Sequence, residues 1–178
     1  ADHTCRVMEQ SFEGMLLKID GTETWSCLIG QHNAYNLLAL YSTAVELGAD
    51  PQEVLVAMST LRPAPGRLEN MRGPRDISVI IDYAHTPDAL ENVLKTLREI
   101  APDRELICVF GCGGDRDRTK RPEMGKIAQK MADRIIVTAD NSRTEKTTDI
   151  MADIKEGMDI SGKAKSLFIE DREQAIRT

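Results

Sequence analysis

The chain of 178 residues has few aromatic side chains, no excess of basic charge and no long apolar run. Phe, Trp and Tyr make up only 4% of the residues while hydrophobic residues make up 41%, so the core must be mainly aliphatic. A formal net charge of -6 argues against a general nucleic-acid binder, whose footprint would be a basic patch or stripe. Because no stretch approaches the roughly 20 apolar residues of a membrane span, no membrane partner is expected.

The cysteines also exclude several classes of site. Cys5, Cys27, Cys108 and Cys112 form no C-x-x-C pair, and no Cys/His cluster has the spacing of a zinc site. We expect reduced thiols that pack as small apolar side chains. Since no signal peptide opens the chain, the sequence predicts a soluble, cytoplasmic protein with no metal ligands of its own.

Three short strands and two helices are expected before residue 62. The strands are predicted at "CRVMEQ", "GMLLKID" and "TWSCLI". Apolar residues then recur at helical spacing over positions 37–47, and Gly48 ends that helix. Asp50 supplies the N-cap of a second helix with Pro51 at its first position. The segment "RPAPGR" follows, and its prolines and glycine indicate a connector between two domains.

Strands and helices alternate from about residue 75 onward. Strands are predicted at "ISVIID", "ELICVF", "RIIVTAD" and "SLFIE", and the first of them is expected to be buried. Helices are predicted at "TPDALENVLKTLREI", with Thr86 as its cap and Pro87 at its first position, and at "RPEMGKIAQKMA", "TTDIMADIKEGM" and "DREQAIRT". This alternation predicts the α/β class, with a doubly wound parallel sheet covered by helices on both faces.

Polar residues follow the first three of these strands, at residues 82–86, 111–118 and 139–145. In open α/β sheets ligands bind beyond the carboxyl ends of the strands, so these segments are expected to share one cleft. Glycines in "GCGGDRDR" would let the backbone approach a ligand closely. Arg116 and Arg118 could then bind a carboxylate or phosphate. A glycine turn with solvated charges is the alternative.

Two common glycine motifs are incomplete. A G-x-G-x-x-G fingerprint would need glycine where Arg116 stands, which disfavours a dinucleotide-dependent oxidoreductase. The segment "GMDISGKA" fits G-x-x-x-x-G-K, but Ala164 replaces the Ser or Thr that would bind magnesium. It also follows a predicted helix, whereas a P-loop follows a strand. We interpret it as a turn that ends a helix, so the chain has no triphosphate-binding loop of its own.

Five segments occur in the order "LIGQHNAYNLLA", "PGRLE", "IIDYAHTPDALENVL", "VFGCGGDRDRTKRPEMG" and "VTADNSRTE". Together they closely resemble the Mur ligase family, and the resemblance covers nearly the whole chain. It implies that residues 1–70 are the C-terminal part of a central ATPase domain. Residues 71–178 would be most of a C-terminal Rossmann-like domain, truncated at its end. The family's P-loop would lie upstream and a G-K-G-H-E-like motif downstream, so the chain alone is expected to lack ligase activity.

The resemblance further implies ATP-dependent amide-bond formation in peptidoglycan precursor synthesis. A monomeric enzyme would add meso-diaminopimelate to UDP-N-acetylmuramoyl-L-alanyl-D-glutamate through an acyl phosphate, with Mg2+ and cationic side chains neutralising the transferring phosphoryl group. The magnesium ligands are expected outside this chain. Lysine-adding members, other Mur ligases and folylpolyglutamate-type ligases are alternatives, and a non-catalytic binding module is another interpretation of the chain taken alone.

For the nucleotide, the resemblance implies contacts from Asn33, Asn36, Arg67, Asp82 and His85. The two asparagines would contact adenine, and Asp82 would accept hydrogen bonds from the ribose hydroxyls. Arg67 near the hinge and His85 beside the phosphates are also the candidate catalytic residues. The alternatives are that the asparagines cap a helix, that Arg67 is a solvated linker residue, and that His85 lies in a helix N-cap region without a catalytic role.

For the incoming amino acid, the resemblance implies a site built from Arg116, Asp140, Asn141, Ser142 and Arg143. Diaminopimelate-adding members carry D-N-P-R where this chain carries D-N-S-R. Arg143 would bind the extra carboxylate of meso-diaminopimelate, which lysine lacks, and Asp140 would face the distal ammonium. Ser142 departs from the family's proline at this position. A salt-bridged surface residue is the alternative for Arg143.

Overall fold

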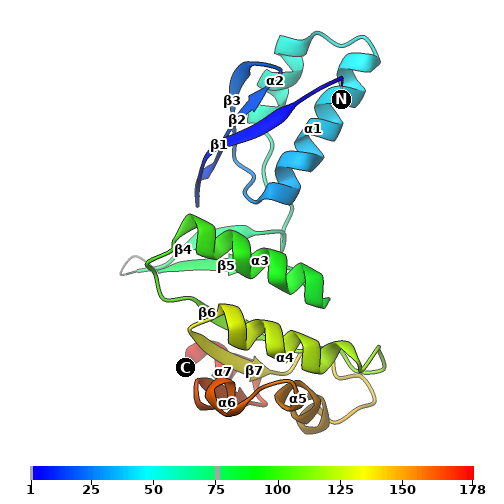
Figure 1. Cartoon of the computed structure of the whole chain (residues 1–178). Coiled ribbons are helices and arrows are strands. Elements are labelled where there is room, and N and C mark those ends of the chain that lie inside the picture. The colour runs from blue at the N-terminus through cyan, green and yellow to red at the C-terminus, as the bar shows by residue number, and fades with distance from the viewer. Residues whose placement is uncertain (1, 75–76) are drawn as a thin grey trace. The chain divides into compact units, whose positions relative to one another are not determined.

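A computed structural model describes residues 2–74 and 77–178. The chain divides into two compact units, Ala1–Tyr83 and Ala84–Thr178, and each has its own elements (Figure 1). Within the described residues, no helix combines the length and the apolar character needed to cross a bilayer.

The first unit packs an antiparallel sheet against two helices. Strands β1 (Cys5–Ser11), β2 (Gly14–Ile19) and β3 (Thr22–Ser26) pair in the order β1-β2-β3. Helices α1 (Gln31–Glu46) and α2 (Pro51–Ser59) follow. Alternate side chains of β2 point into the core, where Met15, Leu17 and Ile19 are fully buried together with residues of both helices. The helix and strand types match the expectation, although β3 lies earlier than the predicted "TWSCLI".

The end of the first predicted helix and the start of the second are confirmed, whereas α1 begins at Gln31, before the predicted apolar pattern over positions 37–47. Helix α1 ends at Glu46, and Gly48 has a φ of 91°, a left-handed conformation that glycine adopts readily. The carboxylate of Asp50 accepts hydrogen bonds from the backbone N–H of Gln52 and Glu53 at 2.9 and 3.0 Å, with Pro51 as the first residue of α2. The cap and the proline therefore fix the start of α2.

The apolar segment "ISVIID" does not join the parallel sheet, which corrects the prediction. It forms β5 (Ser78–Ile81), and β5 pairs antiparallel with β4 (Glu69–Arg72), a strand that the sequence did not indicate. Val79 and Ile81 are 43% and 42% exposed, so β5 is not a buried strand either. An apolar run predicts a strand but does not identify its partner, and the pairing comes from tertiary structure.

The second unit contains the parallel sheet, with β6 (Ile107–Phe110), β7 (Arg134–Thr138) and β8 (Ser166–Ile169) in that order. Its helices are α3 (Pro87–Ile100), α4 (Lys120–Met131), α5 (Thr147–Glu156), α6 (Ile160–Ala164) and α7 (Arg172–Arg177). Helices α3 and α4 lie side by side (Figure 1). The α/β class and the parallel sheet are confirmed for these three strands.

One face of this sheet is covered more fully than the other. Cys108, Phe110, Ile135 and Val137 are buried in one cluster with residues of α3, α4 and α5. Ile107, Val109 and Leu167 alternate with the buried positions and are 48%, 37% and 49% exposed. The predicted covering of both faces is therefore incomplete at these positions of the opposite face.

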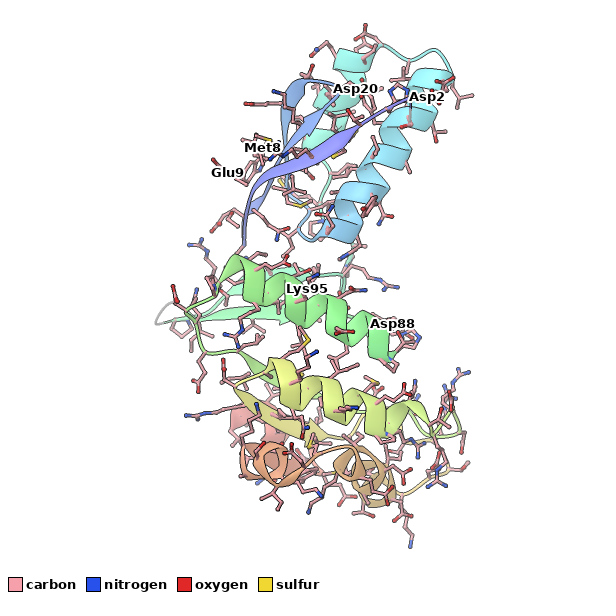
Figure 2. All side chains as sticks on the ribbon, in the orientation of Figure 1. Asp2, Met8, Glu9, Asp20, Asp88 and Lys95 are labelled. Atoms are coloured by element: carbon pink, nitrogen blue, oxygen red, sulfur yellow. The ribbon has the colours of Figure 1, made fainter. Side chains whose placement is uncertain are left out.

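Helix starts in the second unit follow local sequence signals. Thr86 Oγ1 accepts a hydrogen bond from the N–H of Ala89 at 3.3 Å, and Pro87 opens α3, as predicted. Asp88 lies in the first turn of α3 (Figure 2), where its negative charge interacts favourably with the positive end of the helix dipole. The segment "GMDISGKA" is more than a turn, because Asp159 caps the short helix α6 through the N–H of Gly162 at 2.8 Å. It still follows a helix, unlike a P-loop.

Candidate functional site

Two loops lie at the carboxyl ends of the neighbouring strands β6 and β7, at residues 111–119 and 139–146. Their backbones are in contact, since the N–H of Gly114 donates to the carbonyl of Asn141 at 2.9 Å. A Cβ on Gly111 would lie 2.2 Å from the carbonyl oxygen of Thr138, and one on Gly114 would lie 1.9 Å from that of Ser142. Glycine at these two positions therefore permits the close approach of the loops.

A network of ion pairs around a buried arginine connects the second loop, residues 139–146, to helices α4 and α5. Arg121, at the start of α4, has no exposed side-chain area. Its Nη1 donates to Glu145 Oε2 at 2.9 Å and to Asp153 Oδ2 at 2.7 Å, and its Nη2 donates to Glu145 Oε1 at 2.7 Å. Arg118 Nε donates to Asp153 Oδ2 at 3.1 Å. The network therefore joins α4, the loop after β7 and α5.

The network perturbs the titration of its carboxylates. Hydrogen bonds from Arg121 and from the N–H of Asp115 lower the pKa of Glu145 to about 2. Partial burial opposes ionisation of Asp153, but hydrogen bonds from Arg121 and Arg118 outweigh it and lower the pKa of that carboxyl. Both carboxylates are therefore charged at neutral pH and balance the buried guanidinium.

A second set of bonds fixes the backbone next to Arg116 and Arg143. The N–H of Asp115 donates to Glu145 Oε1 at 2.7 Å. The carboxylate of Asp115 accepts hydrogen bonds from Thr144 N–H at 3.2 Å and from Thr144 Oγ1 at 2.6 Å. Asp115 and Arg143 have φ values of 52° and 50°, a left-handed conformation that non-glycine residues seldom adopt. The two loops are therefore tied at the residues that adjoin both arginines.

The predicted amino-acid site falls on these two loops. Arg116, Asp140, Asn141 and Arg143 are exposed. Ser142 is half-buried, and its hydroxyl lies 2.7 Å from Thr147 Oγ1. Among the described residues, the guanidinium groups of Arg116 and Arg143 have no hydrogen-bond or ion-pair partner, so the salt-bridged alternative for Arg143 is not observed. Arg118, the other arginine expected to reach a ligand, is instead paired with Asp153.

The asparagines predicted to contact adenine lie in the first turns of α1. Asn33 Nδ2 donates to the carbonyl of Ile29 at 2.8 Å, and Asn36 Nδ2 donates to Asn33 Oδ1 at 3.3 Å. The N-cap of α1 is Gly30, with a φ of 92° and no side-chain cap. The capping alternative for the asparagines is therefore not observed, and their contact with adenine stays a prediction.

Arg67 lies two residues before β4, and Asp82 directly follows β5, the strand that pairs with β4. The N–H of Leu68 donates to Asp82 Oδ2 at 2.8 Å, and the N–H of Tyr83 donates to the carbonyl of Gly66 at 2.8 Å. The guanidinium carbon of the exposed Arg67 lies 5.2 Å from the centre of the Tyr83 ring, within the range of a cation–π contact. Arg67 is therefore placed by an aromatic neighbour, and its role toward a nucleotide stays a prediction.

His85 belongs to the second unit, directly before the cap of α3. Its ring is exposed, and its backbone carbonyl accepts a hydrogen bond from Lys120 Nζ at 2.8 Å. Lys120 opens α4, so the segment before α3 is tied to the first residue of α4. The proposed proximity of His85 to phosphate groups is not tested by these contacts.

Sequence reasoning missed Arg121, Glu145 and Asp153. Arginine at the start of a predicted helix is usually solvated, and the two carboxylates lie 24 and 32 residues further along the chain. Glu145 was part of the quoted "ADNSRTE", but the pattern gave it no partner. No sequence signal pointed to the network.

No metal site is present in the described residues, where no group of three His, Cys, Asp or Glu side chains could hold an ion. The four cysteines are unpaired. Burial raises the pKa of Cys108 to about 12 and that of Cys112 to about 11, so neither is a thiolate at neutral pH.

Comparison with known proteins matches residues 66–178 to the family described as Mur ligase, glutamate ligase domain. The UDP-N-acetylmuramoyl-L-alanyl-D-glutamate--2,6-diaminopimelate ligase of Bacteroides fragilis is 47% identical over 179 residues, which cover 100% of this chain and 37% of that protein. The ligase of the same name from Cytophaga hutchinsonii is 45% identical over 177 residues, 99% of this chain and 36% of that protein. The chain thus spans little more than a third of the length of these relatives.

Solved structures give the same grouping. A structure of a UDP-N-acetylmuramoyl-L-alanyl-D-glutamate--2,6-diaminopimelate ligase superposes with a TM-score of 0.67 at 40% identity, covering 99% of this chain and 37% of that one. A Mycobacterium tuberculosis folylpolyglutamate synthase complexed with ADP and AMPPCP gives 0.75 at 25% identity, covering 97% and 40%. The family match extends over more than half of this chain, and the chain therefore belongs to the Mur ligase family.

Proposed function

We propose that this chain forms part of a ligase that adds meso-diaminopimelate to UDP-N-acetylmuramoyl-L-alanyl-D-glutamate in an ATP-dependent reaction. The observation that carries the proposal is the pair Arg116 and Arg143, two exposed guanidinium groups without partners in the described chain, on adjoining loops. The relatives that carry the diaminopimelate ligase name at 45–47% identity support the same substrate.

The chemistry of the amino-acid substrate fits these loops. meso-Diaminopimelate has two carboxylates and two amines, so a site for it needs two cationic groups and at least one anionic group. Arg143 and Arg116 are assigned to the carboxylates, since a guanidinium can bind a carboxylate in bidentate fashion. Asp140 is assigned to the distal ammonium, with Asn141 and Ser142 beside it. Such anchoring would hold the reacting amine in position to attack an acyl phosphate.

The nucleotide is assigned to Asn33, Asn36, Arg67, Asp82 and His85. A carboxylate accepts hydrogen bonds only, which suits Asp82 to ribose hydroxyls, and the cationic Arg67 suits a phosphate. Support comes from the folylpolyglutamate synthase that was solved with ADP and AMPPCP. The described residues form no cluster that could hold Mg2+, and the magnesium ligands are assigned to the rest of the complete gene product.

The proposed domain assignment follows the family. Residues 1–70 would be the C-terminal part of a central ATPase domain, and residues 71–178 most of a C-terminal Rossmann-like domain. The family match over residues 66–178 supports this assignment. A cytoplasmic location is part of this proposal, because the nucleotide-linked precursor and ATP are cytoplasmic substrates. A monomeric state is proposed as well.

The deciding experiment is a ligase assay on the complete gene product. The purified protein is supplied with ATP, Mg2+ and UDP-N-acetylmuramoyl-L-alanyl-D-glutamate, together with either meso-diaminopimelate or lysine. We expect tripeptide and phosphate release with meso-diaminopimelate and far slower product formation with lysine. Preference for lysine would replace the proposed substrate by the main alternative, and absence of both products would refute the amide-ligase assignment.

The 178-residue chain by itself is a second test. Because it lacks a P-loop motif, we expect it to form no measurable tripeptide under the same conditions. Binding of meso-diaminopimelate to its second unit, followed by chemical shift changes of the Gly114 and Arg143 amides, would separate a binding role from catalysis. Tripeptide formation by this chain alone would contradict the proposal that the chain is only one part of the ligase.

A further inference from the structure

We propose that Glu145, held by the buried Arg121, is a positioning residue of the amino-acid site. It sets the relative placement of the two loops that carry Arg116 and Arg143 without touching the substrate. The inference deepens the proposed function and rests on the assignment of those two arginines to the substrate.

The position of Glu145 supports this role. Its carboxylate accepts two hydrogen bonds from Arg121, at 2.7 and 2.9 Å, and a third from the N–H of Asp115 at 2.7 Å. Glu145 lies on the loop after β7, two residues beyond Arg143, whereas Asp115 lies on the loop after β6, directly before Arg116. One side chain therefore connects both loops to a fully buried cation.

The cross-loop bonds continue toward the two arginines. Asp115 adds a second link between the loops, because its carboxylate accepts hydrogen bonds from the N–H and the hydroxyl of Thr144, the residue after Arg143. Gly114 donates to the carbonyl of Asn141 at 2.9 Å. The backbones at Arg116 and Arg143 are thus fixed from both sides. This is the arrangement expected of residues that support a site on rigid loops.

Glu145 contributes both a negative charge and two acceptor oxygens to the network. Glutamine has the same shape, but its amide nitrogen would face the N–H groups of Arg121 or Asp115. A donor facing a donor breaks at least one bond and leaves the buried guanidinium with less negative charge around it. Aspartate keeps the charge but is one methylene shorter, so it should restore part of the connection.

The test compares Glu145→Gln, Glu145→Asp and Glu156→Gln in the complete gene product. Glu156 is an exposed glutamate of α5 outside the network and serves as the matched control. We expect Glu145→Gln to raise the KM for meso-diaminopimelate by about tenfold or more, since a misplacement of about 1 Å can cost on the order of a hundredfold. The KM for ATP should change less than about twofold, Glu145→Asp should recover part of the loss, and the control should behave as the parent protein.

Hydrogen exchange provides a readout that does not depend on activity. Because Asp115 donates to Glu145 and Gly114 to Asn141, their amides should exchange faster in Glu145→Gln and not in Glu156→Gln. Equal changes in both KM values, or unchanged exchange at these amides, would overturn the positioning role. If Glu145→Gln does not fold, Glu145→Asp, whose shorter side chain should restore only part of the connection, is measured in the same two ways. An unchanged KM for the amino acid together with unchanged exchange of the Asp115 amide would then refute the inference.

The two proposals fail in different ways. If the parent protein uses lysine, the proposed substrate is wrong, and the same KM comparison is made with lysine to test Glu145. If the parent uses meso-diaminopimelate and Glu145→Gln leaves its KM unchanged, the proposed function stands and the positioning role is wrong.

Discussion

The backbone N–H of Leu68 donates a hydrogen bond to Asp82 Oδ2 at 2.8 Å. Leu68 is 2% exposed and has a φ of 45°, so its backbone is held in a conformation that leucine seldom adopts. A half-buried carboxylate at the end of β5 therefore stabilises the loop that carries Arg67. Asp82 has a structural contact in addition to the nucleotide contact that the family resemblance implies.

This dual role predicts a difference between two substitutions. Asp82→Ala removes the acceptor and should lower the free energy of unfolding by about 1–2 kcal/mol, whereas Asp82→Asn keeps an acceptor oxygen and should cost less. Both should weaken ATP binding if the carboxylate contacts ribose. Urea unfolding of the two variants and the KM for ATP of the complete gene product provide the measurements. Equal stability of the two variants would show that the bond to Leu68 contributes little.

The sequence predicted most elements of both units because capping and periodicity signals are local. Asp50 with Pro51 and Thr86 with Pro87 each marked a helix start that the structure confirms. The predicted place of β5 in the parallel sheet was wrong, because its partner strand could not be identified from a local pattern. Its partner β4 contains Glu69 and Asn70 and has no apolar pattern, and Asn70 is held by a bond from its Nδ2 to the carbonyl of Phe12 at 3.0 Å. Such a strand forms through distant contacts that a local pattern does not contain.

For the candidate site, the contact between the two loops could be predicted from the sequence, but the residues that support the loops could not. Glycines after β6 and polar residues after β7 indicated neighbouring loops, and the bond from Gly114 to Asn141 confirms that contact. Burial of Arg121 was not predictable, because a helix-start arginine becomes fully buried only when distant carboxylates surround it. The sequence therefore pointed to the exposed residues of the two loops more readily than to the buried residues that support those loops.

In the proposed ligase, removal of Arg143 should impair the use of meso-diaminopimelate and leave the use of ATP nearly unchanged. Without its guanidinium, one carboxylate of meso-diaminopimelate is left unpaired, and such a loss costs at least about 2 kcal/mol, or about thirtyfold in kcat/KM. We expect this loss for Arg143→Ala with meso-diaminopimelate, and little change in the KM for ATP. Steady-state kinetics of the complete gene product would measure both.

Arg134→Ala is the matched control for Arg143→Ala. Arg134 is an exposed arginine at the amino end of β7, where it pairs with Glu105 at 2.8 Å. Its removal takes away the same charge at the other end of the strand, so the kinetics should stay near those of the parent protein. An equal loss in both variants would indicate a general charge effect, and an unchanged KM and kcat for meso-diaminopimelate in Arg143→Ala would rule out the carboxylate contact.

Acid should weaken the second unit through Glu145. Its hydrogen bonds from Arg121 and Asp115 lower its pKa from 4.5 to about 2 in the folded protein. A lowered folded-state pKa means that the unfolded chain binds a proton first as the pH falls. The stabilisation is therefore complete above pH 4.5 and is lost progressively between pH 4.5 and 2. The lowered pKa of Asp153 acts in the same direction.

The measurement is the free energy of unfolding of the 178-residue chain at several pH values between 7 and 2. Glu145→Gln should be less stable than the parent at pH 7 and should show a shallower decline below pH 4.5. Glu156→Gln should follow the parent curve. Parallel curves for Glu145→Gln and the parent would mean that Glu145 does not titrate as its hydrogen bonds require.

Gly114 and Gly113 form a matched pair for testing the contact between the loops. A Cβ on Gly114 would lie 1.9 Å from the carbonyl oxygen of Ser142 and 2.7 Å from its carbonyl carbon, so the backbones would have to separate. A Cβ on Gly113 would lie 3.6 Å from the carbonyl oxygen of Asn141, which is an ordinary contact distance. Alanine therefore adds the same methyl group at both positions, but only at Gly114 does this group clash with the neighbouring backbone.

Gly114→Ala should lower the free energy of unfolding by about 1–3 kcal/mol, the range typical of overpacking. It should also raise the KM for meso-diaminopimelate, because the displaced backbone carries Ser142 next to Arg143. Gly113→Ala should change neither quantity appreciably. Chemical denaturation and steady-state kinetics measure the two effects, and equal behaviour of both alanine variants would show that the backbone contact at Gly114 does not constrain the loops. Loss of stability with an unchanged KM would instead separate the loop contact from substrate binding and leave the placement of Arg143 to the bonds around Asp115 and Glu145.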